Sequence, residues 1–310
     1  MGKKDYMIRA MAAGEQFRAF AVTSRNLVEE ARKAHRTSPI ATAALGRTMS
    51  AALMMAYMLK GEDDLLTIQI DSDGPLKGIV VTADSRGGVK GYVKNPLVVL
   101  PAKDDGHLNV GAAVGKGTLT VIRDLDMKNT YTGQIDLYSG EIAEDITHYF
   151  AESEQIPSSV GLGVLINKDI SVRESGGFIV QVMPFATDET VAKLEENLKN
   201  IPHVTDMMRD GAGPEDLLER ALAGFDVEIT DRRDVAFRCN CTRERTDRAL
   251  LLLGEDELSE LMMQKDGTSL QCQFCGKKYH YSPAQLLSLK EELVSQKIRK
   301  KETPDLPEAK

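Results

Sequence analysis

Cys239-Asn240-Cys241 is followed, thirty residues later, by Cys272-Gln273-Phe274-Cys275, and these two pairs contain all four cysteines of the chain. Two close pairs with a spacer of this size are typical of four thiolates that hold one tetrahedral ion, usually zinc. Iron–sulfur ligation fits less well, because clusters normally draw on longer series of cysteines. We therefore expect one Zn²⁺ per chain, and on spacing alone the simplest interpretation is a closed structural site.

The same four thiolates are also targets for oxidants. Each pair is close enough in sequence to close on itself as a disulfide. A disulfide sulfur is a poor zinc ligand, so oxidation would expel the ion. Structural zinc supplies apparent binding free energies of roughly 10 to 16 kcal/mol, which a segment of about fifty residues does not replace from its own core. Oxidation is therefore expected to unfold the segment that contains the cysteines.

Length and composition set the general class. The chain has 310 residues, enough for one sizeable core domain and a smaller one. It shows no apolar run of 18 residues and no charged-then-apolar leader, so we expect a soluble cytoplasmic protein without a membrane partner. Four cysteines in a reducing compartment favour metal or redox chemistry over permanent disulfides. The net charge of −8 argues against general binding of nucleic acid.

Residues 1–186 are expected to form an α+β core domain. Alternating apolar residues predict strands, and a long helix is expected from Pro39 to Leu59, because Ser38-Pro39 is a helix-start signal. A second amphipathic helix is predicted over 142–150. Strand clusters interrupted by helices, without a regular strand–helix repeat, favour a mixed or antiparallel sheet with packed helices. The predicted strands cover 6–11, 17–22, 65–70, 79–83, 89–93, 118–122, 131–137, 160–166 and 178–183.

Residues 187–237, here named the linker, have a different composition. They contain 13 acidic and 6 basic side chains, a net charge of −7. Within that acidity an apolar stripe recurs at helical spacing through Leu194 and Leu198 and, after a Gly-Pro break, through Leu218 and Leu222. We expect an acidic amphipathic helical linker that rests on a neighbouring domain. A helix held mainly by docking has little stability of its own, so it would loosen once that support is lost.

The remaining sequence is predicted as a Cys₄ zinc domain over 238–288 and a charged tail over 289–310. The spacer between the cysteine pairs is expected to be helical over 247–253 and again around Leu258. Residues 239–282 carry 6 basic and 7 acidic side chains, so no positive face for a phosphate backbone is expected. The basic run Lys297-Ile298-Arg299-Lys300-Lys301 is expected to be a solvated, frayed end.

The chain resembles a known family, the bacterial redox-regulated heat-shock chaperones of about 33 kDa, also called the HslO family. The resemblance covers nearly the full chain except the basic tail, and no thiol position departs from the family pattern. It depends on the cysteine quartet in combination with five upstream motifs. These are Gly74-Pro75, Gly91-Tyr92-Val93-Lys94-Asn95-Pro96, Ser139-Gly140-Glu141-Ile142-Ala143-Glu144-Asp145, Ser153-Glu154-Gln155-Ile156-Pro157-Ser158 and Ser175-Gly176-Gly177-Phe178.

The resemblance implies an ATP-independent holdase and not an enzyme. In the reduced, zinc-bound form it would be inactive. Oxidation would join Cys239 to Cys241 and Cys272 to Cys275, release zinc, unfold the switch domain and loosen the linker. The activated chaperone would dimerise and bind unfolding client proteins under oxidative and heat stress. We expect the linker to contribute apolar client contacts at Leu194, Leu198, Leu218 and Leu222.

Two other function classes fit parts of the sequence. A zinc-stapled nucleic-acid or regulatory module would use the quartet and the basic run at 297–301, but the chain lacks a basic face with stacking aromatics. An enzyme with catalytic zinc is weaker still, because four thiolates leave no open coordination position. The glycine-rich stretch 111–117 is one residue too short for a phosphate-binding loop, and Gly117 stands where Ser or Thr should coordinate magnesium.

Overall fold

The computed structural model describes residues 4–125, 130–209 and 211–302, with residues 296–302 described by their backbone only. The chain divides into two compact units, Met1–Arg238 and Cys239–Lys310. Each unit has its own hydrophobic core. The two units are therefore described separately.

The larger unit contains two sheets, which confirms the predicted α+β class with mainly antiparallel pairing. All neighbouring strands are antiparallel except the pair β11 and β5. The first sheet has the spatial order β10 (Val227–Asp234), β1 (Tyr6–Ala12), β2 (Phe17–Thr23), β9 (Val172–Val182), β8 (Ser158–Ile166). The second has the order β11 (Ala236–Phe237), β5 (Gly88–Val93), β4 (Ile79–Asp84), β3 (Leu65–Ser72), β6 (Gly117–Asp124), β7 (Tyr131–Asp136).

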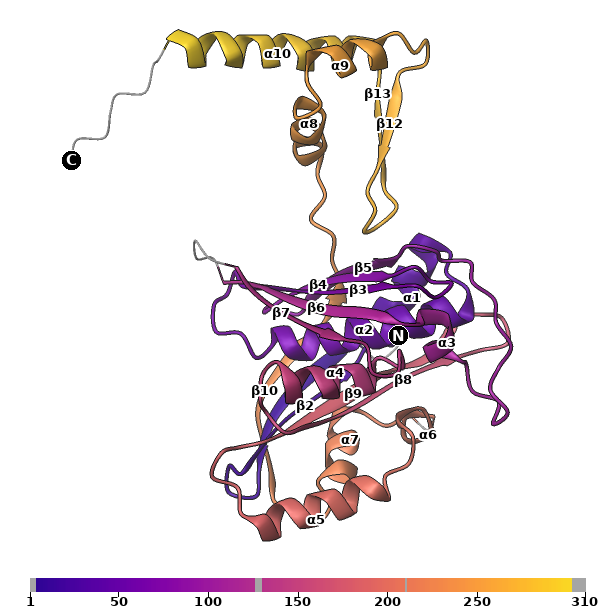
Figure 1. The fold of residues 1–310 in the computed structure, drawn as a ribbon, viewed down its shortest axis with the longest axis vertical. Helices are drawn as coiled ribbons and strands as arrows, with labels where there is room; N and C mark the ends of the chain where they lie inside the picture. Colours follow the sequence, from indigo (N-terminus) through magenta and orange to yellow (C-terminus); the bar gives the residue numbers. More distant parts are fainter. Residues whose placement is uncertain (1–3, 126–129, 210, 303–310) are drawn as a thin grey trace, which may run out of the picture. The chain divides into compact units, whose positions relative to one another are not determined.

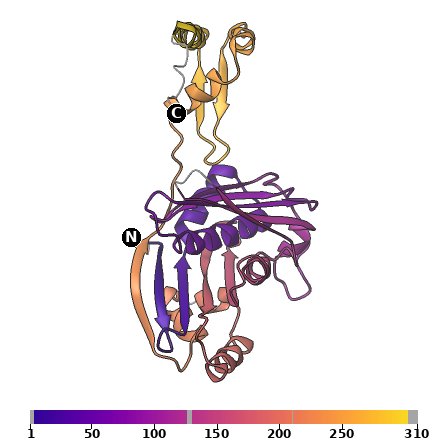
Figure 2. The same cartoon turned by 60° about the vertical axis from the view of Figure 1, so that its left-hand side comes forward.

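The long helix α2 (Pro39–Ala56) lies between these sheets, as Figures 1 and 2 show. It contacts β8 and β9 of the first sheet and β4 and β5 of the second. Nearly every side chain from Ile40 to Ala56 is buried, as expected for a helix that is apolar all round. The methionines of this helix are core residues. Three further helices complete this part of the unit: α1 (Arg25–His35), α3 (Val110–Val114) and α4 (Ala143–Glu152).

The outer face of the first sheet is covered by linker helices α5 (Asp188–Lys199), α6 (Val204–Met208) and α7 (Pro214–Ala221). The first sheet contacts helices on both of its faces because successive side chains of a strand point to opposite faces. Phe17 and Ala19 of β2 point to the linker helices, whereas Phe20 and Val22 point to α2. The apolar stripe of the linker is thus buried by docking on a sheet.

The last part of the linker differs from the expected helix. Residues 227–234 form β10, which pairs with β1, and residues 236–237 form the short strand β11, which pairs with β5. Most side chains of β10 are exposed, and only Val227, Asp231 and Arg233 are half-buried, because the strand lies at the edge of its sheet. Its many charges resemble those of a solvated linker, which explains why the sequence did not reveal this strand.

The smaller unit contains a hairpin and three helices. The hairpin strands are β12 (Thr268–Gln271) and β13 (Lys278–Tyr281), and the helices are α8 (Arg243–Leu251), α9 (Glu255–Met262) and α10 (Pro283–Glu302). The helical spacer is therefore confirmed, with α8 starting earlier than predicted. Residues 289–302, which were predicted as part of a charged tail, continue α10. Residues 303–310 lie outside the described residues.

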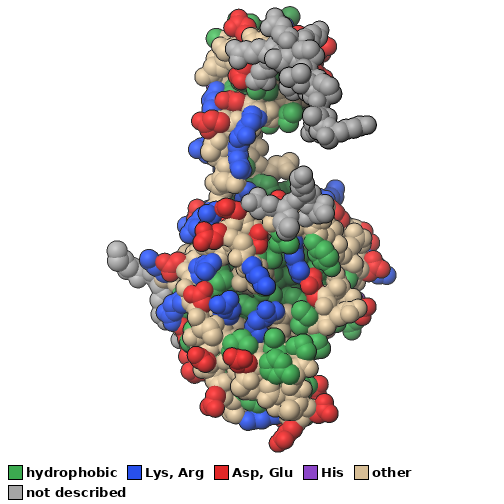
Figure 3. Space-filling model, turned by 90° about the vertical axis from the view of Figure 1, so that its left-hand side faces the viewer, with side chains coloured by type: hydrophobic (Ala, Val, Ile, Leu, Met, Phe, Trp, Pro, Cys, Tyr) green, Lys and Arg blue, Asp and Glu red, His purple; other side chains and the backbone are tan. Residues whose placement is uncertain are grey.

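The face drawn in Figure 3 carries both signs of charge with hydrophobic side chains between them. Among the helices that the structure describes, none combines the length and the apolar content needed to cross a bilayer.

One buried carboxylate organises the turn before α4. Asp145 Oδ1 accepts hydrogen bonds from the backbone N–H groups of Tyr138, Ser139 and Gly140 at 2.8, 3.0 and 3.1 Å. Its Oδ2 accepts a fourth from Ile142 N at 2.9 Å. Asp145, Gly140 and Ile142 are all buried, so the donors of Gly140 and Ile142 have no water to replace the carboxylate. The motif 139–145 is therefore a structural element that fixes the start of a helix.

Replacing this carboxylate should destabilise the protein. We expect Asp145→Ala to lower the free energy of unfolding by roughly 3 kcal/mol, because buried N–H donors lose a charged acceptor. Thermal unfolding of the full chain, followed by circular dichroism, measures the loss. Asp136→Ala is the matched control, because Asp136 is exposed on the neighbouring strand β7 and should change stability little. Equal stability of the two variants would contradict this account.

Candidate metal centre

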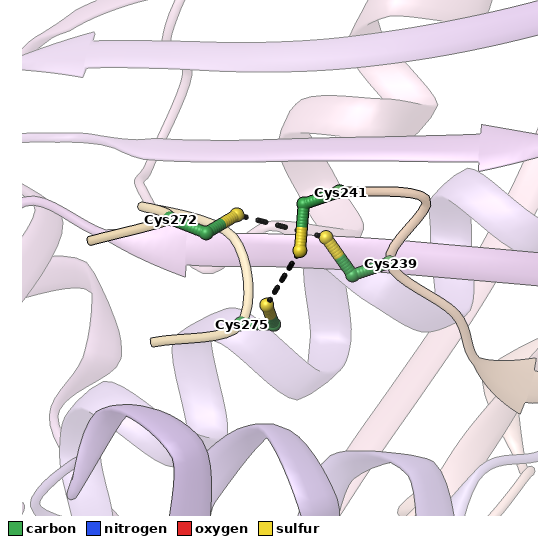
Figure 4. A group of neighbouring side chains, drawn as sticks. All are labelled: Cys239, Cys241, Cys272 and Cys275. Carbon is green, nitrogen blue, oxygen red and sulfur yellow. Dashed lines mark hydrogen bonds between the residues drawn. The ribbon is translucent and has the colours of Figure 1, made fainter. Parts of the chain in front are cut away.

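All four cysteines come together at one site in the smaller unit. Their sulfur atoms lie within 4.8 Å of one another, and all four are half-buried free thiols in this structure. Two sulfur–sulfur contacts join the two pairs: Cys239 Sγ lies 3.7 Å from Cys272 Sγ, and Cys241 Sγ lies 3.4 Å from Cys275 Sγ. Figure 4 shows the four side chains directed toward a common centre.

This arrangement fits a tetrahedral metal. A zinc–sulfur bond of about 2.3 Å places the sulfurs of a regular tetrahedron about 3.8 Å apart, close to the observed separations. The donor set consists of soft thiols only, which suits zinc and other thiolate-binding metals and excludes magnesium or calcium. His280 is not part of this group of possible ligands, and its Nδ1 lies 3.2 Å from Ser269 Oγ.

A tight turn positions the second pair. Cys272 and Cys275 lie between β12 and β13, where Cys272 N donates to Lys277 O and Gly276 N donates to Cys272 O, both at 2.9 Å. Gly276 has a φ of 71°, a left-handed conformation that glycine adopts without strain. The hairpin thus holds both sulfurs on one side of the turn.

The first pair lies on an extended segment that ends at α8. Thr242, directly after Cys241, caps this helix by accepting a hydrogen bond from Arg245 N at 3.3 Å. Tyr279 of β13 holds the same segment from the other side. Its hydroxyl donates to Cys241 O at 2.9 Å and lies 3.3 Å from Cys241 Sγ. The hydroxyl therefore connects the hairpin of the second pair to a sulfur of the first.

Tyr279 is the site residue that sequence reasoning missed. A weak signal was available, because the alternation Lys278-Tyr279-His280-Tyr281 after the last cysteine places both tyrosines on the inner face of a strand. The structure buries both of them, at 6% and 1% exposure.

The four thiols have unequal acidities. For Cys241, burial opposes ionisation, but the hydrogen bond from Tyr279 and those from the other thiols outweigh it and lower the pKa to about 7. Burial and the neighbouring sulfurs raise the pKa of Cys239 and of Cys275. A metal cation would favour thiolates at all four positions, since only the deprotonated sulfur is a ligand.

The unit around the site has a small core. Only five side chains of its described residues form the buried cluster: Leu250, Leu258, Tyr279, Tyr281 and Leu286. One of these, Tyr281, is fixed by polar contacts, with its hydroxyl 2.6 Å from Asp247 Oδ1 and the Arg243 guanidinium 3.9 Å from its ring centre. The Tyr281 contacts and the cysteine site thus join α8 and the segment before it to the hairpin.

The four leucines predicted to contact clients lie in the larger unit, away from solvent. Leu194, Leu218 and Leu222 are 3%, 1% and 1% exposed, and Leu198 is half-buried against the same cluster. They pack on the outer face of the first sheet together with Val204, Met207 and Met208 of α6, which sequence reasoning did not select. In this structure the apolar stripe of the linker is covered.

Comparisons with known proteins agree on one family. Residues 5–282 match the family described as Hsp33 protein. A protein named 33 kDa chaperonin from Agathobacter rectalis is 49% identical over 92% of this chain and 99% of its own length. A second protein with that name, from Clostridioides difficile, is 48% identical over 94% of this chain and 100% of its own length.

A solved structure gives the same result at the level of the fold. The crystal structure of the 33 kDa chaperonin (heat shock protein 33 homolog) from Thermotoga maritima aligns with a TM-score of 0.88 and 35% identity, covering 94% of this chain and 100% of that one. The resemblance found in the sequence is thereby confirmed, and the chain belongs to the Hsp33 family.

Proposed function

We propose that this chain is a redox-regulated molecular chaperone, a holdase that works without ATP. The observation that carries the proposal is the cysteine quartet, four thiols within 4.8 Å of one another in a unit with a five-residue buried cluster. Such a unit depends on its metal for folding, so the oxidation state of the sulfurs controls whether it is folded.

The resident ion in the reduced state is one Zn²⁺ per chain, bound by Cys239, Cys241, Cys272 and Cys275. Zinc is supported by the all-sulfur donor set and the near-tetrahedral spacing. Four thiolates fill the coordination shell, so the zinc has a structural and not a catalytic role, and we assign the chain no enzymatic activity. A reducing compartment, the bacterial cytoplasm, keeps the thiols in the metal-binding form.

Oxidation removes the ligands. Two thiolates and one hydrogen peroxide give one disulfide and two hydroxide ions, so two equivalents of peroxide convert all four sulfurs. The family resemblance pairs Cys239 with Cys241 and Cys272 with Cys275. Loops this short restore little order to the unfolded unit, because closing them removes little chain entropy. The unit therefore unfolds when zinc leaves.

The linker converts this unfolding into client binding. The chain passes from the linker into the zinc unit at Arg238–Cys239, where β11 and the bond from Arg238 N to Val89 O at 2.8 Å are the last attachments to the larger unit. Once the zinc unit is disordered, loosening of the linker helices exposes Leu194, Leu198, Leu218 and Leu222, together with the sheet face beneath them. Unfolding client proteins bind this apolar surface, and the activated chaperone forms a homodimer. Nucleic acids and membranes are not expected partners.

Oxidation of the four cysteines should switch on protection of client proteins. Reduced, zinc-loaded protein should not suppress aggregation of a thermally unfolding client, whereas protein treated with peroxide at mild heat should do so. Light scattering from the client and zinc release to a chromogenic chelator, followed in parallel, measure both events. Reduction with added zinc should reverse them. Protection that is equal in the two states, or that rises while zinc remains bound, would rule out the switch.

The Tyr279 hydroxyl should contribute to zinc affinity. Tyr279→Phe removes the hydroxyl that donates to Cys241 and should raise the pKa of that thiol. Zinc binds only the deprotonated thiol, so a higher pKa of Cys241 means that zinc must displace its proton over a wider pH range. Zinc affinity should therefore fall roughly tenfold, and the loss should be larger at pH 6.5 than at pH 8. Competition with a chelator at both pH values measures the change.

Tyr281→Phe is the matched control for this experiment. It removes the neighbouring hydroxyl, which bonds to Asp247 and does not contact sulfur. It should leave the pH dependence of zinc binding unchanged. An identical pH-dependent loss in both variants would mean that Tyr279 acts only through packing of the hairpin.

Docking of the linker on the first sheet should keep the reduced protein inactive. Truncating Leu218 and Leu222 together to alanine should weaken docking by about 2 to 5 kcal/mol per site while keeping the linker apolar. The reduced protein should then gain partial client protection without oxidation. Glu219→Ala, an exposed position on the same helix, is the control and should stay inactive when reduced.

A linker with charged residues at the four leucine positions distinguishes undocking of the linker from client binding by the linker. With glutamate at positions 194, 198, 218 and 222 the linker should undock but lose its apolar surface, so client capture after oxidation should fall. Undiminished capture would place the client surface on the core instead of the linker.

A further inference from the structure

A basic cavity lies in the larger unit, apart from the cysteine site. It has a volume of about 730 Å³ and opens between the first sheet, the segment that follows α2 and the turn after β4. Its lining contains five basic side chains, Arg9, Arg18, Lys60, Arg86 and Arg233, and only two acidic ones, Glu62 and Asp231. Figure 3 shows Lys and Arg side chains gathered over the middle of this unit. Such a concentration is unexpected in a chain with a net charge of −8.

Two of these arginines are bound only to neutral oxygens. Arg9 Nε donates to Thr230 Oγ1 at 3.2 Å, and Arg18 donates to Gln181 Oε1 from Nε at 3.2 Å and from Nη2 at 2.6 Å. Neither forms an ion pair with a residue that the structure describes. Two guanidinium groups on the same sheet face therefore lack a counter-charge of their own.

The Asp231 carboxylate of the lining is already shared. Asp231 lies opposite Arg9 in the pairing of β1 with β10, and its Oδ2 is 3.3 Å from Arg233 Nη2. The basic group at the turn after β4, Arg86, pairs with Asp63 at 3.4 Å. Burial, and then the charge of Arg9, lower the pKa of Arg18. Both effects disfavour the charged form of Arg18, so an anion bound beside it would stabilise that form.

A buried hydroxyl provides an independent observation. Tyr57 lines the cavity directly after α2 and is 4% exposed, yet its hydroxyl has no hydrogen-bond partner of normal geometry among the described residues. Burial and then the Asp231 carboxylate raise the pKa of Tyr57, so the phenol keeps its proton as a donor. The guanidinium groups of Arg9 and Arg233 lie 5.8 and 4.8 Å from its ring centre. The acceptor that this hydroxyl approaches is Asp231, which is shared with Arg233, so a bound anion would supply the acceptor of full geometry that the hydroxyl lacks.

We propose that this cavity binds a phosphate-bearing small molecule, with its phosphoryl oxygens held by Arg9, Arg18 and Arg233 and by the Tyr57 hydroxyl. Several guanidinium groups around one point favour a dianion with three oxygens over a single carboxylate, since arginine donates in parallel pairs. Met58 and Leu59 supply an apolar wall beside the basic groups, so a phosphate ester with an organic body fits better than free phosphate.

Binding of two probes to the reduced, zinc-loaded full chain tests this site. Phenyl phosphate and inorganic phosphate are titrated by calorimetry at constant ionic strength, with chloride as the balancing anion. Both should bind saturably and compete with each other, and phenyl phosphate should bind more tightly because of its ring. Equal affinities would identify free phosphate as the ligand chemistry. Absence of saturable binding of either probe at millimolar concentration would overturn the proposal.

Variants assign the binding to the named groups. Arg9→Gln and Arg18→Gln should each weaken phenyl phosphate binding at least tenfold, and Tyr57→Phe should weaken it several-fold without loss of the ring. Arg173→Gln, an exposed arginine at the far end of β9, is the matched control and should bind normally.

The thermal shift on adding phenyl phosphate provides a second readout, because a ligand raises the stability of the state that binds it. It should be present in the wild type and the Arg173 variant and absent in the Arg9 and Arg18 variants. If the arginine variants are merely less stable and still show the full shift, the arginines serve only to hold the sheet and the site is disproved.

Discussion

Four sulfur atoms around one metal position are the constraint on which the smaller unit depends. Its buried cluster of five side chains is too small to hold three helices and a hairpin together by burial alone. The sulfurs join two segments that are thirty residues apart, the extended chain before α8 and the turn between β12 and β13. A metal bound at this junction would replace the hydrophobic core that the unit lacks, and the same sulfur chemistry would make the junction sensitive to oxidants.

The larger unit has the opposite character. Its centre is a helix buried on all sides between two sheets, and its turns are fixed by buried polar groups such as Asp145. The linker helices, in contrast, depend on one face of one sheet. On the proposed mechanism, stability differs along the chain: the core would be independent of the metal, the cysteine unit would depend on it, and the linker would depend on its docking surface. This order allows a chemical change at four sulfurs to alter an apolar surface without unfolding the core.

The sequence was sufficient for the parts that depend on local pattern. Cysteine spacing identified four thiols that the fold brings together, apolar alternation identified most strands of the core, and the stripe through Leu194 and Leu218 identified helices that dock. Parts that depend on tertiary context were missed. β10 is a charged edge strand whose partner β1 is more than two hundred residues away, and its sequence resembles a solvated linker. Tyr279 was missed because only the fold places its hydroxyl beside Cys241, and α10 continues a helix where the charges suggested a frayed tail.

Hydrogen exchange of the reduced protein, with and without a zinc chelator, tests the central claim most directly, because it removes the metal without oxidising any sulfur. The account predicts that amides of α8, α9, β12 and β13 lose their protection when zinc is removed, while those of α2 and the strands of both sheets keep theirs. Added zinc should restore the lost protection. Full protection of the hairpin and of α8 in the chelated, reduced protein would show that the unit folds without its metal, and the account would be wrong.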